Sequence, residues 1–136
     1  MKLHVSAGVK NLDDGVSFYT KIFGIPPIKL KEDYAQWELK QVNFSISDRD
    51  TYTEGIDHIG FDVEDEKGIE VFRKRFADEN VKTFNEGETT CCYRESDKLW
   101  AEHDNVKWEI FYSTADSETF YSKEETNCCH EKTTCC

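Results

Sequence analysis

Three side chains from distant parts of the chain have the chemistry of a divalent-metal site: His4, His58 and Glu109. Two imidazoles and one carboxylate form the ligand set of non-haem Fe(II) oxygenases, and this set leaves coordination positions open. A single histidine at the start of a strand is more often an ordinary polar residue on a solvated face. The metal interpretation therefore depends on where these three residues stand in an internal repeat.

The repeat is visible at the start of each half of the chain. His4 and His58 are separated by 54 residues, and Phe18 and Phe72 keep the same offset. Each histidine opens a segment in which apolar residues alternate with small or polar ones, as in a half-buried strand. The two histidines thus occupy equivalent positions in two similar modules.

The ends of the two modules also correspond. The string at residues 42–46 matches the string at residues 106–110, so that Glu109 stands where the first module has Ser45. A serine hydroxyl is a poor ligand for a divalent metal. The repeat therefore predicts three protein ligands, with the fourth symmetry-related position left without a strong donor.

Each half is expected to fold as a βαβββ module. We predict one helix from Asn11, a good N-cap, to Gly24, and a second from about Asp65 to Asp78. The first helix should bury Val16, Tyr19, Ile22 and Phe23, and the second should bury Ile69, Phe72 and Phe76. Strands are expected near residues 4–9, 28–30, 35–39, 42–47, 58–63, 83–85, 99–102 and 107–112.

Strand alternation predicts the direction of the candidate ligands. His4 and His58 lie opposite the apolar residues of their strands, which would pack on the helices. Glu109 lies opposite Trp108 and Ile110 by the same alternation. If the strands curve around one cavity, all three side chains point into it.

The cysteines suggest a second kind of chemistry. The six cysteines form three adjacent pairs: Cys91-Cys92, Cys128-Cys129 and Cys135-Cys136. Neighbouring Cα atoms are about 3.8 Å apart, whereas a disulfide favours about 4.4–6.8 Å, so each pair is poorly built to close on itself. Paired thiols suit a soft ligand such as a monosubstituted trivalent arsenical, which offers two exchangeable positions beside one carbon substituent. Taken alone, such a pair is usually incidental.

Length and composition limit the remaining possibilities. The 136 residues carry a formal net charge of −11 without clustered Lys or Arg, which argues against nucleic acid and anionic membranes as partners. No apolar run is long enough to span a membrane, and no secretory signal is recognisable, so we predict a cytoplasmic protein. We expect one domain over residues 1–113, with modules at about 2–48 and 56–113, and a flexible Cys-rich tail over 114–136.

These motifs together resemble the vicinal-oxygen-chelate superfamily, which includes glyoxalase I, bleomycin-resistance proteins and extradiol dioxygenases. The string Thr89-Thr90-Cys91-Cys92-Tyr93 further resembles the ArsI-type C–As lyases of that superfamily. The superfamily resemblance covers about residues 2–113. It is carried by His4-x7-Leu12, Phe18-Tyr19-x3-Phe23-Gly24, Gly55-x-Asp57-His58-Ile59-Gly60 and Trp108-Glu109-Ile110-Phe111.

The resemblance implies an α+β fold in which two βαβββ modules form a β-barrel, as a monomer or a homodimer. It implies an Fe(II)- and O2-dependent enzyme of extradiol-dioxygenase type that demethylates or dearylates trivalent organoarsenicals. In this interpretation His4, His58 and Glu109 hold Fe(II). Cys91 and Cys92 hold the substrate, for example methylarsenite or trivalent roxarsone.

Two alternatives remain open from the residues. One is a different enzyme of the same fold, such as a glyoxalase-like isomerase or a thiol transferase, although glyoxalase chemistry usually takes a fourth side-chain ligand where this chain has Ser45. The other is a non-catalytic protein that sequesters arsenic or a heavy metal through its thiols. Replacement of Glu109 separates the two classes, because a thiol sink does not need that carboxylate. The preferred organic group on arsenic and the role of the two distal cysteine pairs cannot be read from the residues.

Overall fold

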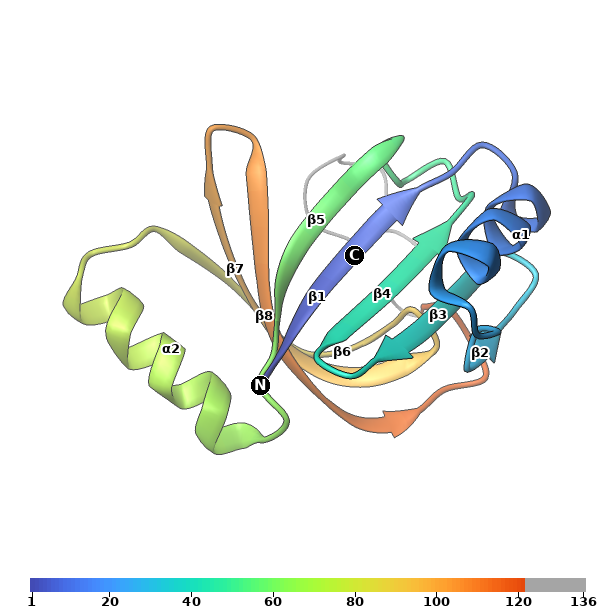
Figure 1. Ribbon diagram of the computed structural model, residues 1–136. Coiled ribbons are helices and arrows are strands. Elements are labelled where there is room, and N and C mark those ends of the chain that lie inside the picture. The colour runs from blue at the N-terminus through green and yellow to red at the C-terminus, as the bar shows by residue number, and fades with distance from the viewer. Residues whose placement is uncertain (122–136) are drawn as a thin grey trace.

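The computed structural model describes residues 1–121, which form one curled eight-stranded sheet with a helix on the outside of each half (Figure 1). In chain order the elements are β1 (Lys2–Gly8), α1 (Leu12–Phe23), β2 (Lys29–Leu30), β3 (Tyr34–Leu39), β4 (Val42–Ser47), β5 (Gly55–Asp62), α2 (Glu66–Asp78), β6 (Thr83–Cys91), β7 (Arg94–His103) and β8 (Val106–Asp116).

The strand order reproduces the predicted repeat. It runs β2-β3-β4-β1-β5-β8-β7-β6, so each module contributes four consecutive strands and the modules meet where β1 pairs antiparallel with β5. The pairs β1–β4 and β5–β8 are parallel and equivalent in the two halves. The predicted α+β class and the two βαβββ modules are confirmed. Within residues 1–121, β2 and β6 form the edges of an open, curled sheet.

The first helix packs its apolar stripe on the outer face of the first module. Asn11 caps it by accepting a hydrogen bond from the backbone N–H of Asp14 at 2.9 Å, and Gly24 ends it in the left-handed conformation with φ of 72°. The prediction that Ile22 is buried is wrong, because this residue is 62% exposed. The stripe that contacts the sheet follows the spacing of three and four residues through Leu12, Val16, Tyr19 and Phe23, and Ile22 lies beside that stripe.

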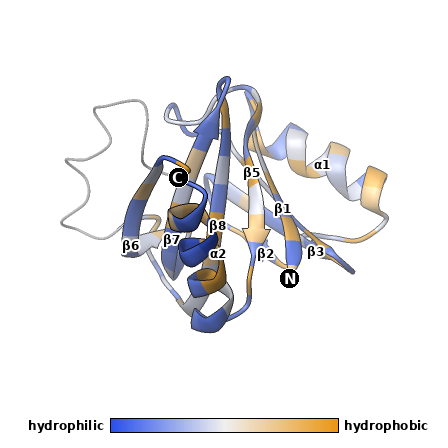
Figure 2. Ribbon diagram, turned by 90° about the vertical axis from the view of Figure 1, so that its left-hand side faces the viewer, coloured by the Kyte–Doolittle hydropathy of each residue, from blue (hydrophilic) through white to orange (hydrophobic). Residues whose placement is uncertain are grey.

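The second helix covers the other module in the same way. Asp65 caps it by accepting from the backbone N–H of Gly68 at 2.9 Å. Ile69 is fully buried, and Phe72 and Phe76 pack beside it on the second core, as predicted. In Figure 2, α2 shows hydrophilic and hydrophobic patches along its length, as an amphipathic helix should. Because both helices cover the outer face, the inner face of the sheet is left for the candidate site.

The β6–β7 hairpin is longer than the sequence predicted. Its strands run to Cys91 and from Arg94, whereas the apolar pattern suggested strands only at residues 83–85 and 99–102. The extra length is rich in Glu, Asp and Lys, because this hairpin ends the sheet and has one face toward the cavity. Hydrophobic alternation is therefore weak there.

The chain also stays ordered beyond the predicted boundary at Thr114. Strand β8 continues to Asp116, and Phe120 is only 5% exposed, among Tyr34 and Tyr52. The rest of the predicted tail, with its cysteine pairs at 128–129 and 135–136, lies outside the described residues. No helix within residues 1–121 is long and apolar enough to cross a membrane.

Candidate functional site

Three neighbouring strands at the centre of the sheet place the predicted metal ligands. His4 on β1 pairs in register with Gly60 on β5, and Gly60 pairs with Glu109 on β8. His58 lies two residues before Gly60 and so points to the same face. A Cβ atom at Gly60 would stand 1.8 Å from the backbone oxygen of Glu109, so only glycine allows the strands to approach this closely. Strand register thus brings the ligands together from both modules.

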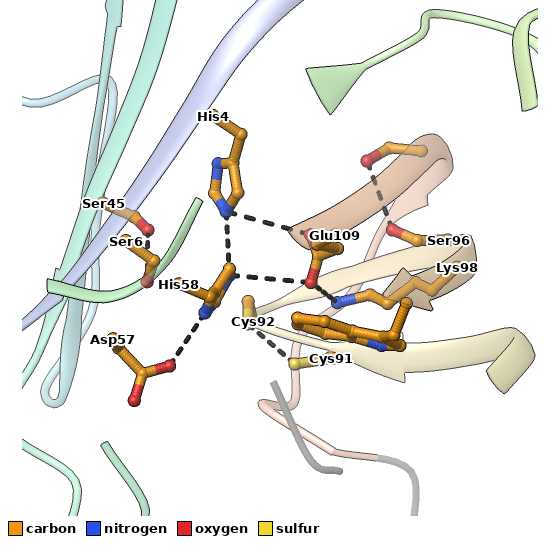
Figure 3. A network of polar contacts seen from close by, with 12 residues as sticks. His4, Ser6, Ser45, Asp57, His58, Cys91, Cys92, Ser96, Lys98 and Glu109 are labelled. Atoms are coloured by element: carbon orange, nitrogen blue, oxygen red, sulfur yellow. Dashed lines mark hydrogen bonds and ion pairs between the residues drawn. The ribbon is translucent and has the colours of Figure 1, made fainter. Parts of the chain in front are cut away.

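The three side chains converge at their polar ends (Figure 3). The Nε2 atoms of His4 and His58 are 3.1 Å apart. The carboxylate of Glu109 lies 3.8 Å from His4 Nε2 through Oε1 and 3.6 Å from His58 Nε2 through Oε2. All three residues are at most 6% exposed. The convergence required by the sequence hypothesis is present in the structure.

These distances fit a single metal ion. Donor atoms of a first-row divalent ion lie about 2.0–2.2 Å from it, so two donors of one ion are no more than about 4.4 Å apart. The separations between the donor atoms of His4, His58 and Glu109 are all shorter than this limit. Two imidazoles with one carboxylate suit iron and related transition metals.

A fixed hydrogen bond orients one of the two imidazoles. Asp57 accepts at 2.8 Å from Nδ1 of His58, which leaves Nε2 of His58 directed toward the other ligands. The same carboxylate accepts from the backbone N–H of Thr53 at 2.7 Å, so its own position is fixed. Carboxylates that hold the second nitrogen of a ligating histidine are a regular feature of metal sites. Asp57 belonged to a motif noted in the sequence, but its role was not predicted.

The charges around the triad favour the metal-binding protonation states. Burial lowers the pKa of His4 to about 3, so the imidazole is neutral at neutral pH. Burial raises the pKa of Glu109, but the neighbouring groups, led by the ammonium of Lys98, together outweigh burial, and the pKa lies below its ordinary value. Lys98 Nζ donates to Glu109 Oε2 at 3.2 Å, and Lys98 is itself only 4% exposed. A neutral imidazole and an ionised carboxylate are the forms that bind metals.

The first module offers no fourth strong ligand. Ser45 is buried at the position equivalent to Glu109, and its hydroxyl donates to the hydroxyl of Ser6 at 3.2 Å. This contact agrees with the expectation that Ser45 is a poor metal ligand. Coordination positions of a bound ion would therefore face the cavity.

The thiol pair stands at the tip of the β6–β7 hairpin. Cys91 ends β6, and Cys92 and Tyr93 form the turn with φ values of 59° and 61°, the left-handed geometry of a tight hairpin. The two Sγ atoms are 2.7 Å apart, and the hydroxyl of Tyr52 lies 3.4 Å from Cys92 Sγ. The turn gives the two sulfurs a defined direction.

The surroundings of the thiols are aromatic and mostly buried. Tyr34, Tyr52 and Phe120 form a cluster around Cys91, and burial raises the pKa of Cys92 to about 11. Cys92 is a free thiol, whereas Cys91 is disulfide-bonded. Capture of one ligand by both sulfurs therefore requires that the disulfide of Cys91 is first reduced.

The metal triad and the thiol pair open into the same cavity. Between them the wall consists mainly of polar side chains from both modules. The lining comprises His4, Ser6, Tyr34, Gln36, Asn43, Ser45, His58, Cys91, Cys92, Arg94, Ser96, Lys98, Glu109 and Phe111. A ligand held by the sulfurs can therefore face the three candidate metal ligands.

Two relatives match nearly the whole chain. The chain is 34% identical to a trivalent organoarsenical cleaving enzyme of Bacillus sp. (strain MD1), over 98% of this chain and 88% of that protein. It is 33% identical to a probable trivalent organoarsenical cleaving enzyme of Bacillus subtilis (strain 168), over 93% of this chain and 89% of that protein. No protein-family model matches the chain.

Solved structures show the same fold at low sequence identity. A methylmalonyl-CoA epimerase from Streptomyces coelicolor superposes with a TM-score of 0.62 at 17% identity, over 82% of this chain and 96% of the other. A glyoxalase/bleomycin resistance protein/dioxygenase superfamily member from Vibrio splendidus 12B01 superposes with a TM-score of 0.56 at 12% identity, over 83% and 98%. The predicted vicinal-oxygen-chelate fold is thus confirmed.

Proposed function

Because the chain belongs to the family of trivalent organoarsenical cleaving enzymes, we propose that it breaks the carbon–arsenic bond of trivalent organoarsenicals with Fe(II) and O2. The observation that carries the proposal is the shared cavity, in which two neighbouring cysteine sulfurs face a two-histidine, one-carboxylate triad. The dithiol alone would suit an arsenic-binding protein, and the triad alone would suit many metalloenzymes. Their combination favours chemistry on a bound arsenical.

The thiols supply substrate binding. With the disulfide of Cys91 reduced, the two sulfurs displace the two hydroxyl groups of methylarsenite and release two molecules of water. The product of this exchange keeps the carbon substituent on arsenic and holds it at two points. Because the substrate is held beside the metal ligands, a bimolecular step becomes effectively unimolecular. This positioning supplies a large part of the rate enhancement in many enzymes.

The triad supplies the metal site. His4, His58 and Glu109 would hold Fe(II), which when bound provides the redox chemistry that O2 requires. Asp57 keeps the imidazole of His58 in place, and Lys98 keeps the carboxylate of Glu109 ionised. For methylarsenite, one molecule of O2 balances the reaction to arsenite and formaldehyde without an external reductant. The buried wall of the cavity keeps bulk water from the reacting groups.

The test is the arsenic speciation after incubation of thiol-reduced protein with Fe(II), air and methylarsenite. We expect arsenite to appear in proportion to O2 consumed, and no arsenite to form under nitrogen or with a chelator. Arsenite release that continues without oxygen and metal would overturn the mechanism. Formation of no arsenite, with methylarsenite bound to the sulfurs, would favour a thiol sink.

Two variants separate an enzyme from a sink. Glu109→Gln should retain methylarsenite at the thiols but lose arsenite release, because the metal site loses its anionic ligand. Cys92→Ser should lose both, because arsenic then has a single sulfur ligand from the pair. If Glu109→Gln releases arsenite at the wild-type rate, the triad is not the catalytic metal site.

A further inference from the structure

A buried lysine accompanies the carboxylate of the metal triad. Lys98 on β7 is 4% exposed, and its ammonium lies 3.2 Å from Oε2 of Glu109. Burial of a lysine is costly unless a partner compensates the charge. Figure 3 shows that this ammonium lies on the side of Glu109 away from His4. The site therefore keeps a permanent cation in contact with one of its own ligands.

The repeat within the chain allows this lysine to be compared with its counterpart in the first module, which lacks the carboxylate. In the first module β3 pairs with β4 so that Tyr34 lies opposite Ser47, and in the second β7 pairs with β8 so that Lys98 lies opposite Phe111. Both members of the second pair stand 64 residues after their counterparts in the first. Tyr34 is thus the counterpart of Lys98. The module with a serine at the ligand position carries a tyrosine there, and the module with a glutamate carries the lysine.

The two oxygens of Glu109 have different partners. Oε2 accepts from Lys98 and lies 3.6 Å from Nε2 of His58, whereas Oε1 lies 3.8 Å from Nε2 of His4. We propose that Lys98 is a positioning residue that occupies Oε2 and restricts Glu109 to a single-oxygen metal ligand, which keeps one more coordination position open toward the cavity. This inference rests on the proposed metal site. It concerns the geometry of that site and not the identity of the substrate.

Removal of the Lys98 ammonium should decrease the number of open coordination positions on the bound ion. Without Lys98, Oε2 is released and both oxygens of Glu109 can bind the ion, so the number of open positions falls. The loss of a cation next to the site also removes repulsion of a divalent ion. Lys98→Met should therefore bind metal at least as tightly as the wild type but with fewer bound waters. A residue needed only for packing would produce the opposite pattern, with weaker binding.

The experiment measures the waters on bound Mn(II), an ion that prefers nitrogen and oxygen ligands over the thiols. Water-proton relaxation reports how many exchangeable waters remain on the ion. With about six positions on Mn(II), a triad with single-oxygen Glu109 leaves about three waters, and two-oxygen binding leaves about two. We expect the relaxation enhancement at saturation to fall by about one third in Lys98→Met.

Matched variants control for charge and packing. Lys98→Arg retains the cation and should behave like the wild type, and Tyr34→Phe changes the equivalent position of the first module without effect on bound waters. Lys98→Gln is the second neutral variant, for use if the methionine variant does not fold. Circular dichroism of the metal-free proteins verifies the fold. Equal relaxation enhancement in wild type and both neutral variants, or weaker Mn(II) binding in them, would overturn the inference.

The outcome is independent of the proposed reaction, because no arsenical is present. If the wild type releases arsenite from methylarsenite but Lys98 has no effect on bound water, only the inference about Lys98 fails. If the relaxation results are as expected but iron-loaded protein forms no arsenite, only the proposed function fails. If Mn(II) does not bind to the wild type at all, the triad is not a metal site and both fail.

Discussion

Replacement of Glu109 by leucine in the metal-free protein should cost a large part of its stability, because it removes the carboxylate that lies against the buried ammonium of Lys98. The two charges are 3.2 Å apart, and at an effective dielectric constant of about 20 this separation corresponds to an attraction of about 5 kcal/mol. Removing one partner of a buried ion pair costs about 3–5 kcal/mol in measured cases. We therefore expect Glu109→Leu to lower the free energy of unfolding by about 3–5 kcal/mol.

The double variant Lys98→Met/Glu109→Leu tests the reason for that loss. Apolar residues of similar volume often replace a buried ion pair at little cost, so the double variant should recover most of the stability that Glu109→Leu loses. The assay is urea unfolding followed by tryptophan fluorescence, in the presence of a chelator and a thiol reductant, for the wild type, both single variants and the double variant.

A surface pair supplies the control. Lys74 and Asp78 form an ion pair on α2 with side chains that are 78% and 57% exposed, and Lys74→Met should change the stability by less than about 1 kcal/mol. A loss below about 1 kcal/mol in Glu109→Leu would refute the reasoning, because the ammonium would then be solvated and not buried. A double variant no more stable than Glu109→Leu would refute it as well.

Three further outcomes follow from the site. Asp57→Asn should lower the Mn(II) affinity about 10–100-fold, because His58 loses the carboxylate that orients it, and electron paramagnetic resonance of free Mn(II) measures this loss. Gly60→Ala should lower the free energy of unfolding by about 3 kcal/mol or more, because the new Cβ meets backbone atoms and not a movable side chain. The control is Gly24→Asn, where the Cβ has open space and asparagine tolerates the positive φ. This control should cost under about 1 kcal/mol in the same urea titration. The rate of alkylation of Cys92 by iodoacetamide should rise about tenfold per pH unit from pH 7 to 9, because a thiol with a pKa of about 11 stays mostly protonated over this range. Peptide mass spectrometry measures the rate. A plateau of the rate near pH 9 would show an ordinary pKa and contradict the prediction.

The sequence predicted the triad because its signal is periodic. His4 and His58 hold equivalent places in two modules, and alternation along the strands gives the direction of each side chain. Glu109 followed from the match of the two final strands. Neither step needed the contacts between distant residues, which explains why the convergence was predictable without a structure.

Lys98 and the thiol turn were not predictable in this way. A lysine in a strand is normally solvent-exposed, and only the fold shows that its ammonium is buried against Glu109. The hairpin at Cys92 and Tyr93 uses two left-handed residues without the Asn-Gly or Asp-Gly string that usually marks such a turn. In both cases tertiary contacts decide the outcome, and these contacts have no local signature.

The ligands are divided between the modules, with His4 on β1 and both His58 and Glu109 across the β1–β5 pairing. An ion bound by all three side chains would link the two modules, so binding of the ion would increase the free energy of unfolding. At a free-ion concentration of about one hundred times Kd, such linkage adds about 2.7 kcal/mol to the free energy of unfolding. If the proposed metal occupies the site, its removal should lower the Tm, and the difference in Tm with and without a chelator reports the size of this coupling.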